Sequence, residues 1–422
     1  MNHPWFGGMQ VYDFLKNRRF KPGAGGALMG PIYLDNNATT RVSKVVLDEM
    51  LPFHNVLYGN PSSIHTFGSQ VAEKVEEARE QVATLIGAHP KEILFSSGGT
   101  ESDNTAIRSA LEVSPEKRHI VASAVEHPAI RSLCRYLSKR GYRVTEVPVN
   151  GEGELDMDYY EKSLTSDTAV VSLMWANNET GVLFPVEKAA LLAHERGIPF
   201  HTDAVQAVGK IPIDLKNSPM DMLSLSGHKL HGPKGVGVLY VRRGTRFKPT
   251  ILGGHQERGR RAGTENTAAV IGLGKACELA SHEMDKKNSR IKRLRDKLEG
   301  GILAGVPNIR VNGRNAPRLP NTTNISFEYV DGEGILLLLD ELGICASSGS
   351  ACTSGSLEPS HVLLAMGVPA STAQGAVRFS LSKYNRKEEI DFVIEKIPGI
   401  IRKLRDMSPL WPYGGEYVSR AA

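Results

Sequence analysis

The sequence of 422 residues has few cysteines and no long apolar run. Its four cysteines are too few and too scattered for a disulfide framework in a chain of this length, which favours a reducing cytoplasm. They are Cys134, Cys277, Cys345 and Cys352. No segment approaches the ~20 consecutive apolar residues of a membrane span, so we expect no contact with a membrane core.

An excess of one charge is also absent. The chain has 51 basic and 46 acidic residues, a net charge of +5, and no long arginine or lysine block that would follow a nucleic-acid backbone. The hydrophobic share of 41% and the charged share of 23% are those of an ordinary globular protein. At this length we expect two domains and a sizeable buried core.

The order of apolar and polar segments predicts an α/β fold. Between about residues 94 and 240, short apolar runs alternate with helical patterns, and each apolar run ends in a Gly, Ser, Asn or Asp cluster. Repeated strand and helix units predict a mostly parallel sheet with helices on both faces. A charged amphipathic helix is expected from Lys275 to Gly305, and short strands follow it. The expected units are a loosely ordered extension over residues 1–30, a segment over 31–45 that joins the second domain, a large domain over 46–285 and a small α+β domain over 286–422.

The N-terminal residues have no apolar segment behind a basic start, so they do not read as a secretory signal. Met29 stands just before the first expected strand, and a start of translation there is the alternative to a loosely ordered extension over residues 1–28.

Residues with cofactor chemistry stand at the ends of successive expected strands. Lys229 in SGHKLHGPKG can form a Schiff base, with an ordinary surface lysine as the alternative. Gly99 and Thr100 in SSGGTESDN begin a helix whose free amides can bind phosphate, with a plain glycine turn as the alternative. Asp203 in HTDAVQAVGK can keep a pyridinium nitrogen protonated or cap the helix expected after it, on whose first turn Gln206 lies.

Four further residues are ambiguous when taken singly. His127 in VEHPAI can stack on a flat ring, although most lone histidines are structural. Asn178 in WANNETG and Thr264 in RAGTEN are also ordinary turn residues. Arg378 in AVRFS stands alone among apolar residues and needs a partner, either a substrate carboxylate or a structural salt bridge. Together with the lysine and the phosphate turn, they indicate one cofactor site.

Cys352 differs from the other cysteines in its surroundings. The segment SSGSACTSGSLEPSHVL has neither helical nor strand periodicity, which predicts a mobile loop in which a thiolate can reach a substrate. A buried, inert thiol is the alternative. Cys345 ends the apolar run ELGIC and is expected in the core, and its spacing from Cys352 is unlike that of zinc ligands.

With these residues assembled, the chain resembles the NifS/IscS family of cysteine desulfurases, within the class V aminotransferase superfamily of pyridoxal 5'-phosphate (PLP) enzymes. The resemblance covers about residues 32–410. Its motifs, in order, are YLDNNATT, YGNPSSIH, SSGGTESDN, NNETG, HTDAVQAVGK, SGHKLHGPKG, GGHQERGRRAGTEN, SSGSACTSGSLEPSHVL and RFSLS. GHQERGRRAGTEN and SGSLEPSHVLLAMG are more similar to the nitrogen-fixation branch, whereas the tail SPLWP is similar to the housekeeping branch.

The resemblance implies a PLP-dependent transferase of fold type I, with a seven-stranded sheet, and a homodimer. It implies that Lys229 holds the cofactor covalently, that Asp203 pairs with the pyridinium nitrogen and Gln206 with the phenolic oxygen, and that His127 stacks on the ring. The cofactor-binding residues carried over are Gly99, Thr100, His127, Asn178, Asp203, Gln206, Ser226, Gly227, His228, Lys229 and the partner subunit's Thr264. The substrate-binding residues are Asn178 and Arg378, and the catalytic ones are Lys229, His127 and Cys352.

The implied reaction removes sulfur from L-cysteine, releases L-alanine and leaves a persulfide on Cys352. The family passes this sulfur to an iron-sulfur scaffold protein, here for nitrogenase maturation, and Cys352 is implied as a transient iron-sulfur ligand shared with that scaffold. The alternatives are a housekeeping desulfurase, a selenocysteine lyase, a class V aminotransferase and a non-catalytic scaffold. Transamination needs no nucleophilic thiol, and a scaffold needs neither Lys229 nor Asp203.

Overall fold

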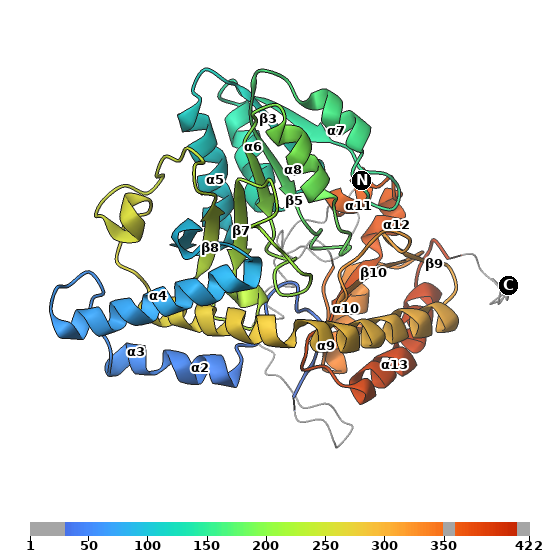
Figure 1. The fold of residues 1–422 in the computed structure, drawn as a ribbon. Coiled ribbons are helices and arrows are strands. Elements are labelled where there is room, and N and C mark those ends of the chain that lie inside the picture. Colours follow the sequence, from blue (N-terminus) through green and yellow to red (C-terminus); the bar gives the residue numbers. More distant parts are fainter. Residues whose placement is uncertain (1–29, 349–358, 412–422) are drawn as a thin grey trace.

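The computed structural model describes residues 30–348 and 359–411 (Figure 1). Its largest sheet has seven strands in the order β2-β8-β7-β6-β5-β3-β4. The strands are β2 (Ile93–Ser96), β3 (His119–Ser123), β4 (Arg143–Val147), β5 (Thr168–Met174), β6 (Phe200–Asp203), β7 (Met222–Ser226) and β8 (Gly237–Val241). Only β8 runs against the others, because it is antiparallel to both of its neighbours. The expected seven-stranded, mostly parallel sheet is therefore confirmed.

Helices cover both faces of this sheet, so its strands are buried on both sides. Side chains alternate between the two faces along a strand. In β5, Val170 packs with Ile107 and Leu133, whereas the next residue, Val171, packs with Ala190 on the other face. Burial on both faces explains why these strands read as continuous apolar runs. The helices around the sheet are α2 (Lys44–Met50), α3 (Pro52–Asn55), α4 (Thr66–Ile86), α5 (Gly99–Val113), α6 (Pro128–Ser138), α7 (Met157–Ser163) and α8 (Val186–His194).

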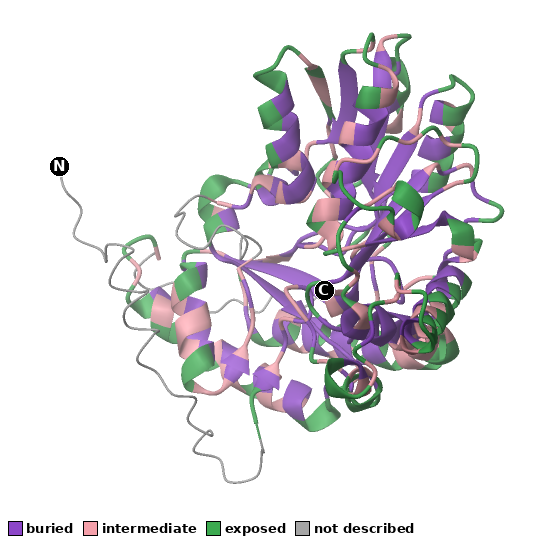
Figure 2. Cartoon of the chain, turned by 90° about the vertical axis from the view of Figure 1, so that its left-hand side faces the viewer, coloured by how far each residue is buried: buried purple, intermediate pink, exposed green. Residues whose placement is uncertain are grey.

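A second apolar core surrounds a three-stranded antiparallel sheet, β12-β10-β9. Figure 2 shows buried residues along the strands of the protein. Strand β1 pairs in parallel with β11, so Ile32 and Leu34 enter this second core beside Phe379. The elements here are β1 (Ile32–Tyr33), β9 (Ile309–Val311), β10 (Thr322–Phe327), α10 (Gly332–Glu341), β11 (Ile344–Cys345), α11 (His361–Ala365), α12 (Ala370–Gln374), β12 (Ala376–Ser380) and α13 (Lys387–Asp406).

One helix contributes to both cores. Helix α9 (Thr267–Gly305) has 39 residues and is therefore about 58 Å long at 1.5 Å per residue. Leu273 packs in the first core and Leu298 in the second. The helix begins earlier than the sequence predicts, at a cap in which the Asn266 side chain accepts from the Ala269 backbone N–H. The predicted domain boundary near residue 285 falls inside this helix and stays a prediction.

One expected helix is absent from the described residues. Residues 205–210, after β6, form consecutive turns instead of the helix predicted from AVQAV. The Asp203 carboxylate accepts from the Val205 backbone N–H at 2.9 Å, and Gly209 has φ +73°, a left-handed conformation that ends helical geometry. Gln206 thus lies in a turn. No helix in the two described stretches is long and apolar enough to span a membrane.

Candidate active site

Most of the predicted site residues lie at one edge of the large sheet. Strands β2, β3, β5, β6 and β7 run in the same direction, so their carboxyl ends share that edge, where ligands bind in sheets of this kind. The residues that follow or end these strands are Gly99 and Thr100 after β2, His127 after β3, Asn178 after β5, Asp203 in β6, and Ser226 to Lys229 at β7.

The start of α5 forms an anion-binding corner. Its N-cap, Gly98, has φ +154° and no side chain, so no side-chain cap occupies the first amides of the helix. The buried Ser226 hydroxyl lies 3.9 Å from the place that a Cβ on Gly98 would take. Gly237 of β8 allows this approach, because a Cβ there would lie 2.7 Å from the Gly98 Cα. Gly99 lies in this corner, and Thr100 is exposed beside it.

The Lys229 amine is held by a segment far away in the sequence. Lys229 ends the 3₁₀ turn Gly227–Lys229, and its Nζ donates to the carbonyl of Ala38 at 2.8 Å and to that of Asn37. Next to it, His228 Nδ1 lies 3.2 Å from the Thr39 hydroxyl, and burial with the nearby Lys229 charge lowers the pKa of His228 to about 4. A neutral His228 can donate to or accept from a bound anion without adding charge.

Asp203 and His127 form an electrostatic pair beside this lysine. Burial raises the pKa of Asp203, while the nearby His127 and Lys229 oppose that rise. Burial lowers the pKa of His127, and Asp203 opposes that fall. His127 Nδ1 accepts from the Ala129 N–H at 3.2 Å and caps α6, so the proton of the neutral ring is on Nε2. His127 therefore has a structural contact as well as a place at the site.

Gln206 connects the lysine segment with a second lysine. Its Nε2 donates to the Asn37 carbonyl at 3.0 Å, the same oxygen that accepts from Lys229. Its Oε1 accepts from Lys210 Nζ at 2.8 Å. These contacts orient the amide of Gln206 with its NH₂ group toward Lys229.

Arg378 lies on β12 and reaches the same region from the second core. Its Nη2 donates to Asp35 at 2.8 Å and its Nη1 donates to the Asn178 carbonyl at 3.0 Å. Its buried Nε has no hydrogen-bond partner within the described residues. The structural salt bridge, which was one of the two alternatives for Arg378 in the sequence, is thus present. The Nε–H of Arg378 remains available as a donor.

Several residues of this edge were missed in the sequence. Asp35 and Asn37 belong to the polar run DNNATT directly after buried Leu34, which was the available signal. Glu126 stands before His127 and is fully buried, where its Oε1 accepts from the Met174 N–H at 3.0 Å, and burial raises its pKa to about 8. Nothing in VEHPAI distinguishes this glutamate from an exposed one.

Two of the predicted site residues, Thr264 and Cys352, are not seen at this edge in the described part of the chain. Thr264 is exposed in the loop before α9. Cys352 lies outside the described residues. Cys345, expected in the core, is half-buried in β11, and burial raises the pKa of its thiol. No group of three or more His, Cys, Asp or Glu residues that could hold a metal occurs in the parts of the chain that the structure describes.

The comparisons with known proteins agree with this geometry. The family described as Aminotransferase class-V matches residues 32–393. A protein of Azotobacter vinelandii named cysteine desulfurase NifS is 61% identical over 388 residues, 92% of this chain and 96% of that protein. A cysteine desulfurase of Trichormus azollae is 58% identical, covering 90% of this chain and 95% of that protein.

Solved structures give the same assignment. A NifS-like protein aligns with a TM-score of 0.83 at 40% identity, covering 89% of this chain and all of that one (100%). The structure titled "SspA in complex with cysteine" aligns with a TM-score of 0.75 at 34% identity, covering 84% of this chain and 100% of the other.

Proposed function

This chain belongs to the cysteine desulfurases of the class V aminotransferase family, and from that premise we propose that it removes sulfur from free L-cysteine with bound PLP. The observation that carries the proposal is the position of Lys229, Asp203 and His127 at one sheet edge. They have the chemistry that a pyridine aldehyde phosphate needs, and each influences the charge of another.

The residues present fit this cofactor. A buried carboxylate whose pKa is raised by burial is stabilised by a cation, and a pyridinium N–H beside Asp203 would be that cation. The uncapped start of α5, with Ser226 and His228, would hold the phosphate. PLP bound here supplies an electron sink that stabilises negative charge at the substrate α-carbon. Gln206 would donate to the phenolic oxygen, and His127 would stack on the ring.

The substrate would be held across the two cores. Arg378 binds its carboxylate, with the free Nε–H available for that contact, and Asn178 lies beside it through its own contact with the Arg378 guanidinium. The Lys229 amine would take the α-proton of the substrate.

The sulfur transfer itself needs a thiolate. The Cys352 thiolate attacks the substrate sulfur, a sulfur–sulfur bond forms, and the carbon–sulfur bond breaks with its electron pair left on carbon, which takes a proton to give alanine. Cys352 is left as a persulfide. We place the acceptor among iron-sulfur scaffold proteins, with Cys352 as a transient shared ligand and nitrogenase maturation as the purpose. The nitrogen-fixation motifs and the identity to NifS support this choice.

A homodimer would complete the phosphate site with the partner subunit's Thr264. Support comes from exposed apolar side chains near the N-terminal helices and the loop before α9. They include Leu47, Leu51, Val56, Tyr58, Ile64 and Leu252. Ile64 and Leu252 are 102% and 80% exposed, which is unfavourable for large apolar side chains in a monomer. Light scattering of the purified protein should give twice the 46.0 kDa chain mass.

The decisive experiment measures alanine and sulfide from L-cysteine with a reductant while the cofactor absorbance is recorded. Wild type should release equal amounts of both. Cys352→Ala should stay yellow and release neither, whereas the matched control Cys345→Ala should retain activity. Full activity in Cys352→Ala would contradict the scheme. A yellow wild type that releases nothing but transfers its amino group to a keto acid would instead be an aminotransferase, and a colourless protein that takes up no PLP would be a scaffold.

A further inference from the structure

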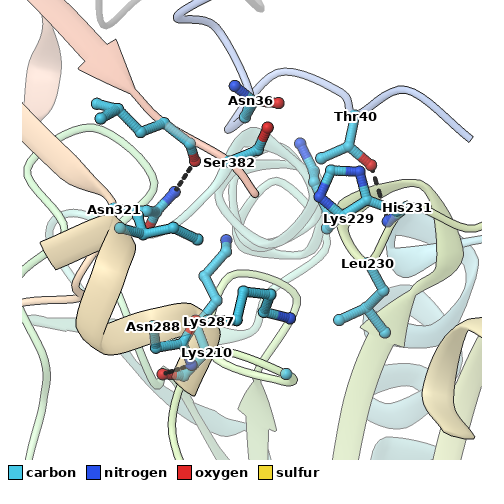
Figure 3. Close-up of a pocket in the computed structure, with 13 residues that line it drawn as sticks. Asn36, Thr40, Lys210, Lys229, Leu230, His231, Lys287, Asn288, Asn321 and Ser382 are labelled. Carbon is cyan, nitrogen blue, oxygen red and sulfur yellow. Dashed lines mark hydrogen bonds between the residues drawn. The ribbon is translucent and has the colours of Figure 1, made fainter. Parts of the chain in front are cut away.

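A small pocket lies behind Lys229, where the two cores meet. It has a volume of about 30 Å³ and is lined by residues of the β6–β7 region, of α9 and of the segment after β12 (Figure 3). Three lysines, Lys210, Lys229 and Lys287, line it together, and none of its lining residues is acidic. Asp203 and His127, which would contact the cofactor ring, do not line the pocket, whereas Lys229 does.

The charged side chains that line this pocket are all basic. Burial and the charges of Lys229 and Lys287 lower the pKa of Lys210 well below its usual range. Burial and the nearby Lys383 lower the pKa of Lys287 to about 8, against a smaller opposing effect of Glu283. Glu283 is half-exposed and lies 3.3 Å from the amine of Lys383, so it does not serve the pocket.

The neutral residues do not compensate these amines. Asn36 Nδ2 donates to the Ser380 carbonyl at 2.8 Å, and Asn321 Nδ2 donates to the Leu381 carbonyl at 3.3 Å. Lys210 Nζ donates to one acceptor, Gln206 Oε1, and Lys287 Nζ has no hydrogen-bond partner among the described residues. Ammonium groups that line one small pocket without an acidic residue repel one another unless they lose protons or gain an anion.

We propose that this pocket binds a small inorganic anion of the chloride class, held between Lys210 and Lys287. About 30 Å³ gives room for one monatomic ion or a pair of waters. The anion would connect the large sheet, through Lys210, with α9, through Lys287. It would also stand next to Lys229. The inference does not depend on the proposed reaction, because binding can be measured in the cofactor-free protein.

The first test is the melting temperature of the cofactor-free protein in sodium chloride and in sodium gluconate of equal ionic strength. Gluconate is a much larger and more weakly binding anion than chloride and serves as the reference. Chloride should raise the melting temperature of wild type by about 2 °C in a saturable manner. Lys287→Met and Lys210→Met should lose this difference. Lys286→Met is the matched control, because Lys286 is an exposed neighbour on the same helix, and it should keep the difference.

The second test does not depend on the variants folding. Wild-type crystals soaked in sodium bromide should give an anomalous peak between the amines of Lys210 and Lys287. Bromide found only elsewhere would overturn the proposal. So would equal melting temperatures of wild type in chloride and gluconate, which would mean that the amines are neutral and the pocket holds water.

Discussion

Two buried arginines, one in each core region, have the same exposure and different surroundings. The side chains of Arg79 on α4 and Arg378 on β12 are each 3% exposed. Arg79 forms two parallel bonds with Glu257, at 2.8 and 2.9 Å, and further bonds with Glu76 and the Ile93 carbonyl. Arg378 has one carboxylate contact, one carbonyl contact and a buried Nε without a partner among the described residues.

The difference shows how to distinguish a structural arginine from a binding one. Burial is equal in both, so burial does not separate them. Donors that are all used within the chain indicate a structural role, as in Arg79, whose guanidinium donates to two carboxylates and one carbonyl. A donor left over in a buried place indicates a missing acceptor, which for Arg378 would be the substrate carboxylate.

The ion pair between Arg79 and Glu257 also holds a loop in place. Glu257 has φ +48°, a strained left-handed conformation, and its Oε2 also accepts from the Phe95 N–H at 3.0 Å. The loop that Glu257 begins carries Thr264. Arg79 therefore holds the loop that is proposed to reach the partner subunit, and it does so without contact to the site.

The largest effect is expected from Arg79→Met. Removal of one member of a buried ion pair leaves Glu257 uncompensated, which should lower the free energy of unfolding by about 3–5 kcal/mol. Urea denaturation of the cofactor-free protein measures it. The activity per folded molecule should stay within about twofold of wild type when assayed as the dimer.

The double variant Arg79→Met with Glu257→Gln is the control for this prediction. It removes both charges and should recover most of the lost stability. If the double variant were as unstable as the single one, the apolar contact of Arg79 with Phe95 would be the main contribution.

Arg378→Lys should lower the activity strongly and the stability little, the opposite of Arg79→Met. Lysine keeps the charge but cannot bind a carboxylate in a fork, so kcat/KM for L-cysteine should fall about 100-fold, mostly through KM, with a small change in stability. Steady-state kinetics and urea denaturation on the same preparation separate the two effects. A large loss of stability with an unchanged KM would show that the salt bridge with Asp35 is the only role of Arg378.

The sequence predicted where strands end but not which distant residues meet there. The sequence predicted that Lys229, Asp203 and His127 lie together, because each is at or after the end of an apolar run, and they do lie at one sheet edge. The sequence did not predict the partner of Arg378, because Asp35 is 343 positions away and only tertiary packing brings it near. The contact of Lys229 with the Asn37 carbonyl is equally nonlocal. The prediction of a helix after β6 was wrong, because Gly209 has a positive φ there. The spacing of apolar residues does not indicate such a φ.

Glu126 provides a second test of whether a buried polar atom without a hydrogen-bond partner indicates a residue of the site. Glu126 Oε2 has no hydrogen-bond partner in the described part of the chain, and burial raises the Glu126 pKa to about 8. The folded state therefore holds a proton that the unfolded state loses above about pH 4.3. This contribution to stability is present below that pH and is lost as the pH rises toward 8.

Glu126→Gln keeps an acceptor for Met174 and cannot ionise. Its stability relative to wild type should increase by up to about 1.4 kcal/mol per pH unit between pH ~5 and ~8. Denaturation of the cofactor-free proteins at several pH values measures it. Glu299→Gln is the matched control. Arg318 and Thr323 hold the pKa of Glu299 low despite burial, so Glu299 is ionised in both states over this pH range, and its substitution should change stability by an amount that does not vary with pH. Parallel curves for wild type and Glu126→Gln would show that Glu126 is ionised in the folded protein.

The smallest effect is expected from Asp35→Asn, which addresses the one carboxylate that Arg378 already has. Asp35 is partly exposed and would compete with a substrate carboxylate for the same guanidinium. The asparagine keeps an acceptor and loses the charge, so the KM for L-cysteine should fall about two- to fivefold with kcat unchanged. Asp48→Asn, in an exposed pair with Lys44, should change neither value. A rise in KM would mean that Asp35 positions Arg378 instead of competing with the substrate, and Arg378 would then resemble Arg79 more closely than its unused Nε suggests.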